Sequence, residues 1–325
     1  MSAAKPATGA LRPMARLERW LLPPLLLALV LLAAVEPRPE VIEGGAETRV
    51  QQRILLQDTQ INESSGLVCS LSHPGLFWTH NDSFGAPRLF AIDQRGQTRA
   101  VLHLRDAPNL DWEDLATWRR SDGSAVLVVA DIGDNLHVRS GVDFYEVPEP
   151  SNLPPPQGGE ILVKPTAHWR VKYPDGRHNA EAFAIDPRSG RAWVVTKDSA
   201  GHSALYSFSV AQPPDGKVIT LQRMAALELP PRPRVGKAPH HAQMVTGASI
   251  AADGRWFALA TYSVLLEWPL DADGDVAAAL KGEPKLLTPP LLKQLEAIAH
   301  APGQRAIWCS SEQLPAAFYQ LSLEP

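Results

Sequence analysis

Internal repetition constrains the fold of this chain more than any other feature of its sequence. A four-residue pattern recurs five times: a polar residue, a small residue, a bulky apolar residue, then Ala or Val. The copies are Ser65–Val68, Glu113–Ala116, Glu181–Ala184, Thr246–Ser249 and Glu296–Ala299, and the copy at Thr246 is the weakest. Units of about fifty residues that recur in this way are typical of modular folds in which one supersecondary unit is repeated.

Each copy begins a series of short apolar runs separated by turn residues. Gly ends the turn after three of the copies, at Gly190, Gly254 and Gly303, where the chain must reverse. A second and a third apolar run follow in every copy, and four copies add a fourth, more polar run such as Thr98–Leu104. Four short antiparallel strands form the blade of a β-propeller, so the sequence predicts five blades. A β-sandwich would not require a repeat of this length.

The last copy has no fourth run because the chain ends there. The segment Arg53–Asp58 precedes the first blade and alternates between apolar and polar residues. Pairing this N-terminal strand with the last blade would close the propeller and remove both open edges. The prediction is an all-β, five-bladed propeller over residues 53–325, and five blades are favoured over six.

The N-terminus has the features of a targeting segment. Four cationic residues up to Arg19 precede an apolar stretch at residues 20–35. A cationic start and a short apolar core predict a signal peptide or an anchor helix over residues 1–36, followed by a linker at 37–52. The propeller is then exported, and two outcomes stay open: anchoring with membrane contact through residues 20–35, or release to the periplasm or the exterior after cleavage.

Composition excludes several classes of protein. The formal net charge is −4 and no basic run is interleaved with aromatics, so a nucleic-acid partner is not expected. The motifs of zinc proteases, α/β-hydrolases and P-loop proteins are absent. Cys69 and Cys309 are too few for a disulfide framework. They fall in blades that would be neighbours, so a disulfide and two buried thiols both stay open.

The leading residues of the five copies are the candidate metal ligands. The first strand of each blade lines the central axis, so equivalent positions should face one another at one mouth of the channel. These residues are Ser65, Glu113, Glu181, Thr246 and Glu296. Two carboxylates 5 Å apart repel by about 3 kcal/mol, so three must take up protons or bind a cation. An all-oxygen set favours Ca²⁺. Structural hydrogen bonds to neighbouring blades and a water-filled channel are the alternatives.

Polar loops are expected at the same mouth. Asp131 and Asp134 are candidates to activate a water molecule, with His178 as a possible general base and Lys197 as a stabiliser of negative charge. Further polar side chains are candidates to bind a substrate. They are Asn81, Asp82, Asn135, Asn179, Asp198 and Glu312. Because turns are rich in Asn, Asp and Ser, such residues also occur there for structural reasons.

The order of the leading residues resembles that of the calcium-activated nucleotidases, or apyrases. That family is a five-bladed propeller that places one oxygen ligand from each blade around an axial Ca²⁺, in the order Ser, Glu, Glu, Ser, Glu. In this chain Ser65, Glu113, Glu181 and Glu296 match, and Thr246 stands where the family has Ser. The chain is more loosely similar to exported phytase-like and esterase-like propellers.

Two functions are compatible with these residues. The first is an exported, Ca²⁺-dependent hydrolase of phosphate esters or anhydrides, in which the ion would neutralise substrate oxygens and position water. The second is a non-enzymatic propeller with a structural ion, whose polar mouth binds a small molecule or a partner protein.

Overall fold

The computed structural model describes residues 49–153, 159–199, 202–229, 243–287, 294–312 and 314–323. Within these residues the structure is all-β, apart from the short helix α1 (Val276–Ala279). The expected signal or anchor segment at 1–36 lies outside the described residues. Most of the expected linker does too, although its last four residues belong to a strand that begins at Arg49. None of the described helices is long and apolar enough to cross a membrane.

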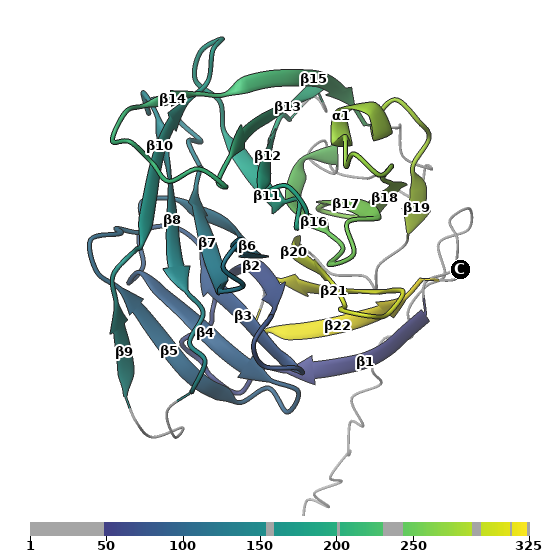
Figure 1. Cartoon of the computed structure of the whole chain (residues 1–325). Helices are drawn as coiled ribbons and strands as arrows, with labels where there is room; N and C mark the ends of the chain where they lie inside the picture. Colours follow the sequence, from purple (N-terminus) through teal and green to yellow (C-terminus); the bar gives the residue numbers. More distant parts are fainter. Residues whose placement is uncertain are drawn as a thin grey trace, which may run out of the picture. The chain divides into compact units, whose positions relative to one another are not determined.

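Five sheets are arranged as the blades of a propeller (Figure 1). In each blade the innermost strand carries one copy of the repeat. Blade 1 contains β2 (Ser64–Cys69), β3 (Leu76–Asn81), β4 (Arg88–Asp93), β5 (Thr98–Leu104) and β9 (Glu160–Val163). Blade 2 contains β6 (Trp112–Arg119), β7 (Ala125–Asp131), β8 (Val142–Pro148), β10 (Ala167–Lys172) and β14 (Ile219–Thr220). The predicted five-bladed fold is confirmed.

The remaining blades have four strands each. Blade 3 contains β11 (Ala180–Ile185), β12 (Arg191–Thr196), β13 (His202–Ser209) and β15 (Gln222–Glu228). Blade 4 contains β16 (Val245–Ile250), β17 (Trp256–Thr261), β18 (Leu265–Pro269) and β19 (Lys285–Leu287). Blade 5 contains β20 (Leu295–His300), β21 (Ala306–Ser311), β22 (Ala317–Ser322) and β1 (Arg49–Leu55).

The N-terminal strand closes the propeller as predicted. β1 pairs antiparallel with β22, with Ile54 opposite Phe318. Each inner strand also contacts the inner strands of the two neighbouring blades, in the order β2, β6, β11, β16, β20 and back to β2. The first and last blades therefore pack against each other in the same way as every other pair of neighbouring blades.

The core is divided among the blade interfaces. Five buried apolar clusters lie within the described residues, one between each pair of neighbouring blades. Phe144 of blade 2 packs on Phe183 of blade 3 with ring centroids 4.9 Å apart. Phe77 of blade 1 packs edge-on against Trp308 of blade 5 at 4.7 Å. Such large aromatic contacts bury area on both partners and fix how the blades pack.

The two cysteines are both free thiols. Cys69 lies at the end of β2 and Cys309 is buried in β21. Burial raises the pKa of each thiol to about 12. Of the two alternatives left open by the sequence, the structure has the unbonded thiols.

Candidate functional site

The five leading residues occupy equivalent positions, each at a β-bulge of its inner strand. The register between inner and second strands shifts at these five points, so the leading residue is left out of the ladder in every blade. A bulge re-aims the side chain of the unpaired residue. The repeat in the sequence therefore encodes a repeated break in strand pairing at one end of the channel.

The two hydroxyl residues of this set tie neighbouring blades together. Ser65 Oγ donates a hydrogen bond to the carbonyl oxygen of Glu113 at 2.7 Å. Thr246 Oγ1 donates in the same way to Leu295 O at 2.6 Å. Each hydroxyl proton is thus engaged by the backbone of the next blade, and only the oxygen lone pairs remain for other partners.

The three glutamates are buried, with 4 to 5% of their surface exposed. Burial is the main cause that raises the pKa of Glu113 and Glu296 well above the ordinary range, and repulsion from Glu181 adds to it. Burial also raises the pKa of Glu181 to about 7, against the opposing effect of its ion pair with Lys197. The ammonium group of Lys197 also donates to Tyr262 Oη at 2.7 Å.

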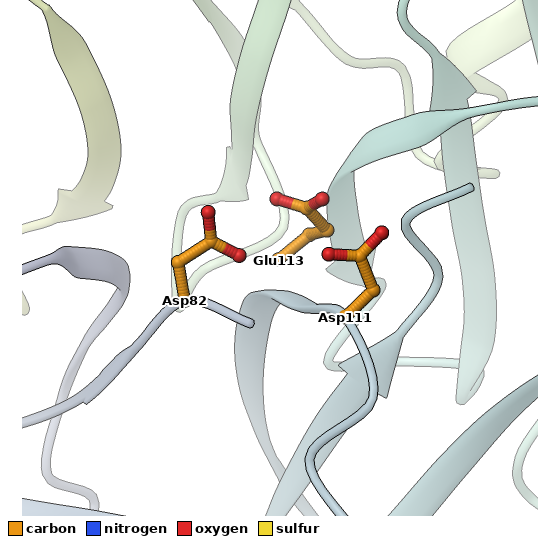
Figure 2. Close-up of side chains that lie close together, drawn as sticks. All are labelled: Asp82, Asp111 and Glu113. Carbon is orange, nitrogen blue, oxygen red and sulfur yellow. The ribbon is translucent and has the colours of Figure 1, made fainter. Parts of the chain in front are cut away.

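The closest grouping of carboxylates lies to one side, between blades 1 and 2. Asp82, Asp111 and Glu113 each place an oxygen within 4.8 Å of the other two, and no other acidic, His or Cys trio among the described residues does so. Figure 2 shows the three carboxylates turned toward one another. We call this trio the acidic cluster. It shares only Glu113 with the five predicted metal ligands.

Three local features build the acidic cluster. Asp82 follows β3, Asp111 directly precedes β6, and Glu113 is the bulged residue of β6. Burial raises the pKa of Asp82 to about 6, with repulsion from Asp111 as a further cause. Burial also raises the pKa of Asp111, and nearby Arg139 opposes that shift. The three carboxyls of the cluster therefore resist ionisation unless a positive charge compensates them.

Gly133 makes room for this cluster. A Cβ atom at this position would overlap Asp111 Oδ2 and Glu113 Oε1, well inside van der Waals contact. The backbone of the loop between β7 and β8 can approach the carboxylates only because residue 133 has no side chain. The three carboxylate oxygens lie beside a backbone segment that has no side chain. Such a set of oxygen donors fits a hard divalent cation such as Ca²⁺.

The two predicted catalytic aspartates are used as hydrogen-bond acceptors. Asp131 is fully buried, pairs with Arg139 at 2.6 Å, and accepts from the backbone N–H groups of Leu110 and Asp111. Asp134 accepts from the N–H groups of Val138 and Arg139 at 2.8 and 2.9 Å. Both carboxylates therefore hold the loop after β7, and Asp131 positions the backbone of Asp111.

His178, a predicted catalytic residue, and two of the predicted substrate-binding residues have partners as well. His178 Nε2 lies 3.1 Å from Asp175 Oδ1 and 3.2 Å from the hydroxyl of Tyr206. Asn179 accepts from the N–H of Asp134 and donates to Asn135 Oδ1 at 3.1 Å. These contacts connect blades 2 and 3 beside the same mouth.

The remaining predicted substrate-binding residues lie at the end of a strand or in loops around this mouth. Asn81 accepts from the N–H groups of Asn62 and Glu63 and donates to Gln60 O. Asp198 accepts from His202 N at 3.1 Å. Glu312 accepts from Gln294 at 3.0 Å, and burial raises the pKa of its carboxyl.

Sequence reasoning missed the role of Asp114, which connects the inner strands of blades 2, 3 and 4. Its carboxylate accepts hydrogen bonds from its neighbour Leu115 N at 2.8 Å, from Phe183 N of blade 3 at 2.8 Å and from Ala248 N of blade 4 at 3.1 Å. Burial raises the pKa of Asp114, and these three donors oppose the shift. A signal was present, because Asp114 is the one acidic residue at the second position of the repeat.

A cavity of about 300 Å³ opens at the opposite ends of the inner strands. Its walls come from all five blades and are mostly apolar, with Trp118, Ile185 and Ile250 among them. Ser249 and His300 also line it. Leu115, Phe183 and Ala248, whose N–H groups bind Asp114, line it as well, so this carboxylate lies near the boundary between the two ends.

Comparisons with known proteins support the fold. No family model and no curated protein matches this chain. Among solved structures, the major allergen Mala s 1 of Malassezia sympodialis aligns with a TM-score of 0.51 and 9% identity, over 84% of this chain and 97% of that one. At this identity the likeness shows the propeller fold alone, and the resemblance to the nucleotidases rests on the axial pattern only.

Two further solved structures align more weakly and carry no argument about function. A chain of the nidogen/laminin complex aligns at 10% identity with a TM-score of 0.39, over 76% of this chain and 72% of that one. Raptor of Chaetomium thermophilum aligns at 9% identity with a TM-score of 0.43, over 86% of this chain and 29% of that one.

Proposed function

We propose that this protein binds one divalent cation, Ca²⁺ by preference, at the acidic cluster of Asp82, Asp111 and Glu113. The observation that carries the proposal is that three carboxylate oxygens lie within 4.8 Å of one another beside the open backbone of Gly133. Charges so close must be protonated or compensated, and a cation provides compensation. The donor set contains only oxygen, which suits Ca²⁺ better than zinc or copper.

The bound ion would serve as an anchor for a ligand. Ca²⁺ takes six to eight oxygen ligands, and three carboxylates leave positions for water and for oxygens of a ligand. A small molecule or a protein segment with carboxylate, phosphate or hydroxyl oxygens would complete the coordination. Asp131 and Asp134 are engaged in holding the loop after β7, which favours ligand binding over hydrolysis of a phosphate ester.

The proposal includes export of the propeller. Ca²⁺ sites of moderate affinity are filled where the ion is abundant, and weak sites are typical of extracellular modules. The cationic residues before the apolar stretch at 20–35 agree with transfer across a membrane. Whether the segment is cleaved or remains as an anchor decides if the propeller is released or held at the membrane.

Isothermal titration of the metal-free full chain with CaCl₂ tests the proposal. We expect saturable binding of one ion, weakened at least tenfold by Glu113→Gln. A hundredfold excess of Ca²⁺ over its dissociation constant should add about 2.7 kcal/mol to the free energy of unfolding. Glu63→Gln is the matched control, because Glu63 is an exposed carboxylate next to the same mouth. Equal affinity in the wild type and Glu113→Gln would refute the site.

A further inference from the structure

The cavity at the opposite end of the channel contains a hydrogen-bonded array that the proposed cation site does not use. Ser249 Oγ lies 3.0 Å from His300 Nδ1. The other ring nitrogen, His300 Nε2, lies 3.3 Å from Glu267 Oε1. Arg305 in turn makes two charged hydrogen bonds to the Glu267 carboxylate, at 2.8 and 2.7 Å. A hydroxyl, an imidazole and a carboxylate are thus connected in series.

The charge on Glu267 determines which groups of this array donate hydrogen bonds and which accept them. The ion pair with Arg305 keeps Glu267 as an anion, so the carboxylate accepts and His300 Nε2 carries the proton. In the neutral ring Nδ1 then faces Ser249 with its lone pair and accepts the hydroxyl proton. This is the order of roles in a nucleophile–base–carboxylate triad, which is recognised by geometry and not by sequence position.

The scaffold holds the three groups on rigid elements of two blades. Ser249 lies on β16 and Glu267 on β18, both of blade 4, whereas His300 ends β20 of blade 5. Glu267 is fully buried and His300 is 8% exposed. Ser249 is more accessible than either and lines the cavity. The backbone N–H of His300 also donates to Ser249 Oγ at 3.0 Å, which fixes the hydroxyl relative to the ring.

We propose that Ser249 is an activated nucleophile that takes an acyl group from small carboxylic esters bound in this cavity. Ser249 Oγ attacks the ester carbonyl while its proton passes to His300 Nδ1. The tetrahedral intermediate expels the alkoxide, which takes that proton and leaves as the alcohol. Water then attacks the acyl-serine while His300 Nδ1 accepts its proton. The bond between the acyl carbon and Ser249 Oγ breaks, His300 returns the proton to Ser249 Oγ, and the acid is released. Glu267 positions the imidazole and stabilises its charged form.

Cavity size and lining define the substrate class. A volume of about 300 Å³ is at the lower limit for ligand pockets, so the acyl and alcohol groups must both be small. Most of the lining side chains are aliphatic, Trp118 and Phe183 add aromatic surface, and Arg119 adds a charged group. Uncharged esters of short acids with apolar alcohols fit this lining. A phosphate ester would leave water for mainly aliphatic side chains, and the one guanidinium group in the lining, of Arg119, already donates to the carbonyl oxygens of Gly123 and Leu71.

Covalent labelling of the full chain tests the assignment. The protein is incubated with a small alkyl fluorophosphonate and, separately, with p-nitrophenyl butyrate, in EDTA so that the cation site plays no part. We expect one fluorophosphonate adduct per chain, located on Ser249 by peptide mass spectrometry. Ser249→Ala should abolish it. Thr117→Val is the matched control, because Thr117 is a hydroxyl residue that lines the same cavity but lies outside the array.

His300→Gln separates nucleophilic activation from simple access. A glutamine can keep part of the hydrogen bonding but cannot act as the base, so the labelling rate should fall at least a hundredfold. Melting curves must show that this variant is folded. The assignment is refuted if the wild type remains unlabelled, if the adduct lies on another residue, or if folded His300→Gln reacts at the wild-type rate. The wild-type measurement stands even if a variant fails to fold.

Discussion

The two ends of the central channel are built by the same five inner strands but have opposite chemistry. The strands begin at the acidic mouth, where bulges release Glu113, Glu181 and Glu296 from the ladder. They end at the apolar cavity, which includes Ile185 and Ile250. Each strand contributes to both ends, so each copy of the repeat begins with a polar residue and continues with mainly apolar ones, Asp114 and Ser249 being the exceptions. The propeller therefore offers two separate sites on one axis.

Asp114 connects three inner strands between these two ends, and its loss should have the largest effect on stability. Asp114→Ala removes the carboxylate that accepts hydrogen bonds from Phe183 N of blade 3 and Ala248 N of blade 4. These two buried N–H groups then lose their acceptor. We expect the free energy of unfolding to fall by about 4 kcal/mol. Urea denaturation measures it.

Two variants control this measurement. Asp114→Asn keeps one acceptor oxygen and should lose less stability than Asp114→Ala. Asp122→Ala removes a fully exposed turn aspartate and should behave as the wild type. If Asp114→Ala unfolds at the wild-type urea concentration, the inner strands do not depend on this carboxylate.

Asp131 gives the second-largest expected effect and distinguishes a structural from a catalytic aspartate at the acidic end. Asp131→Ala removes the 2.6 Å partner of the partly buried Arg139 and leaves it only the longer ion pair with Asp143 at 3.5 Å, which should cost about 3 kcal/mol of stability. The double variant Asp131→Ala/Arg139→Ala should recover part of that loss, since neither charge then remains alone. Unchanged stability in the single variant would make Asp131 a candidate base again.

The fold was predictable because the repeat marks the same structural event in each blade. The four-residue pattern was enough to align Ser65 and Thr246 with the three glutamates. All five leading residues lie at β-bulges in the structure. β9 and β14 were not predicted. β9 lies between β8 and β10, and β14 lies between β13 and β15, so each follows the third strand of a blade and extends the preceding blade by parallel pairing. No periodic pattern in the sequence predicts such pairing.

The sites were only partly predictable, for a physical reason. Glu113 and Asp82 were expected at one mouth, but their grouping with Asp111 depends on a loop conformation that the repeat does not specify. The array at His300 joins residues 51 and 33 positions apart across a blade interface. Side-chain packing between blades decides such contacts, so a pattern within one blade cannot reveal them.

Gly133→Ala should affect the acidic end alone. The added Cβ would displace Asp111 and Glu113 without removing a carboxylate. We expect the dissociation constant for Ca²⁺ to rise at least tenfold, which corresponds to about 1.4 kcal/mol, while labelling of Ser249 is unchanged. Gly85→Ala is the control because a Cβ there meets its nearest atoms at 3.8 Å. Parallel loss of binding in both variants would show a general disturbance of the mouth.

Acidification should give the smallest effect, with opposite signs at the two ends. At the acidic end, the folded protein holds the Asp82 proton up to a pKa of about 6, whereas the unfolded chain releases it near 3.8. The folded state binds more protons in that window, so the contribution of Asp82 to stability falls as the pH rises from about 4 to about 6. Asp82→Asn should remove this slope in EDTA.

At the apolar end the sign reverses. Burial tends to raise the pKa of Glu267, but hydrogen bonds from His300 and Arg305 outweigh it and hold the pKa below its usual value of 4.5. The stabilisation from Glu267 is therefore complete above pH 4.5 and is lost as the pH falls through the lowered pKa. Urea denaturation between pH 3 and 7 should show Glu267→Gln losing less stability on acidification than the wild type. Equal slopes for Asp82→Asn and Glu267→Gln would show that the two ends do not differ electrostatically.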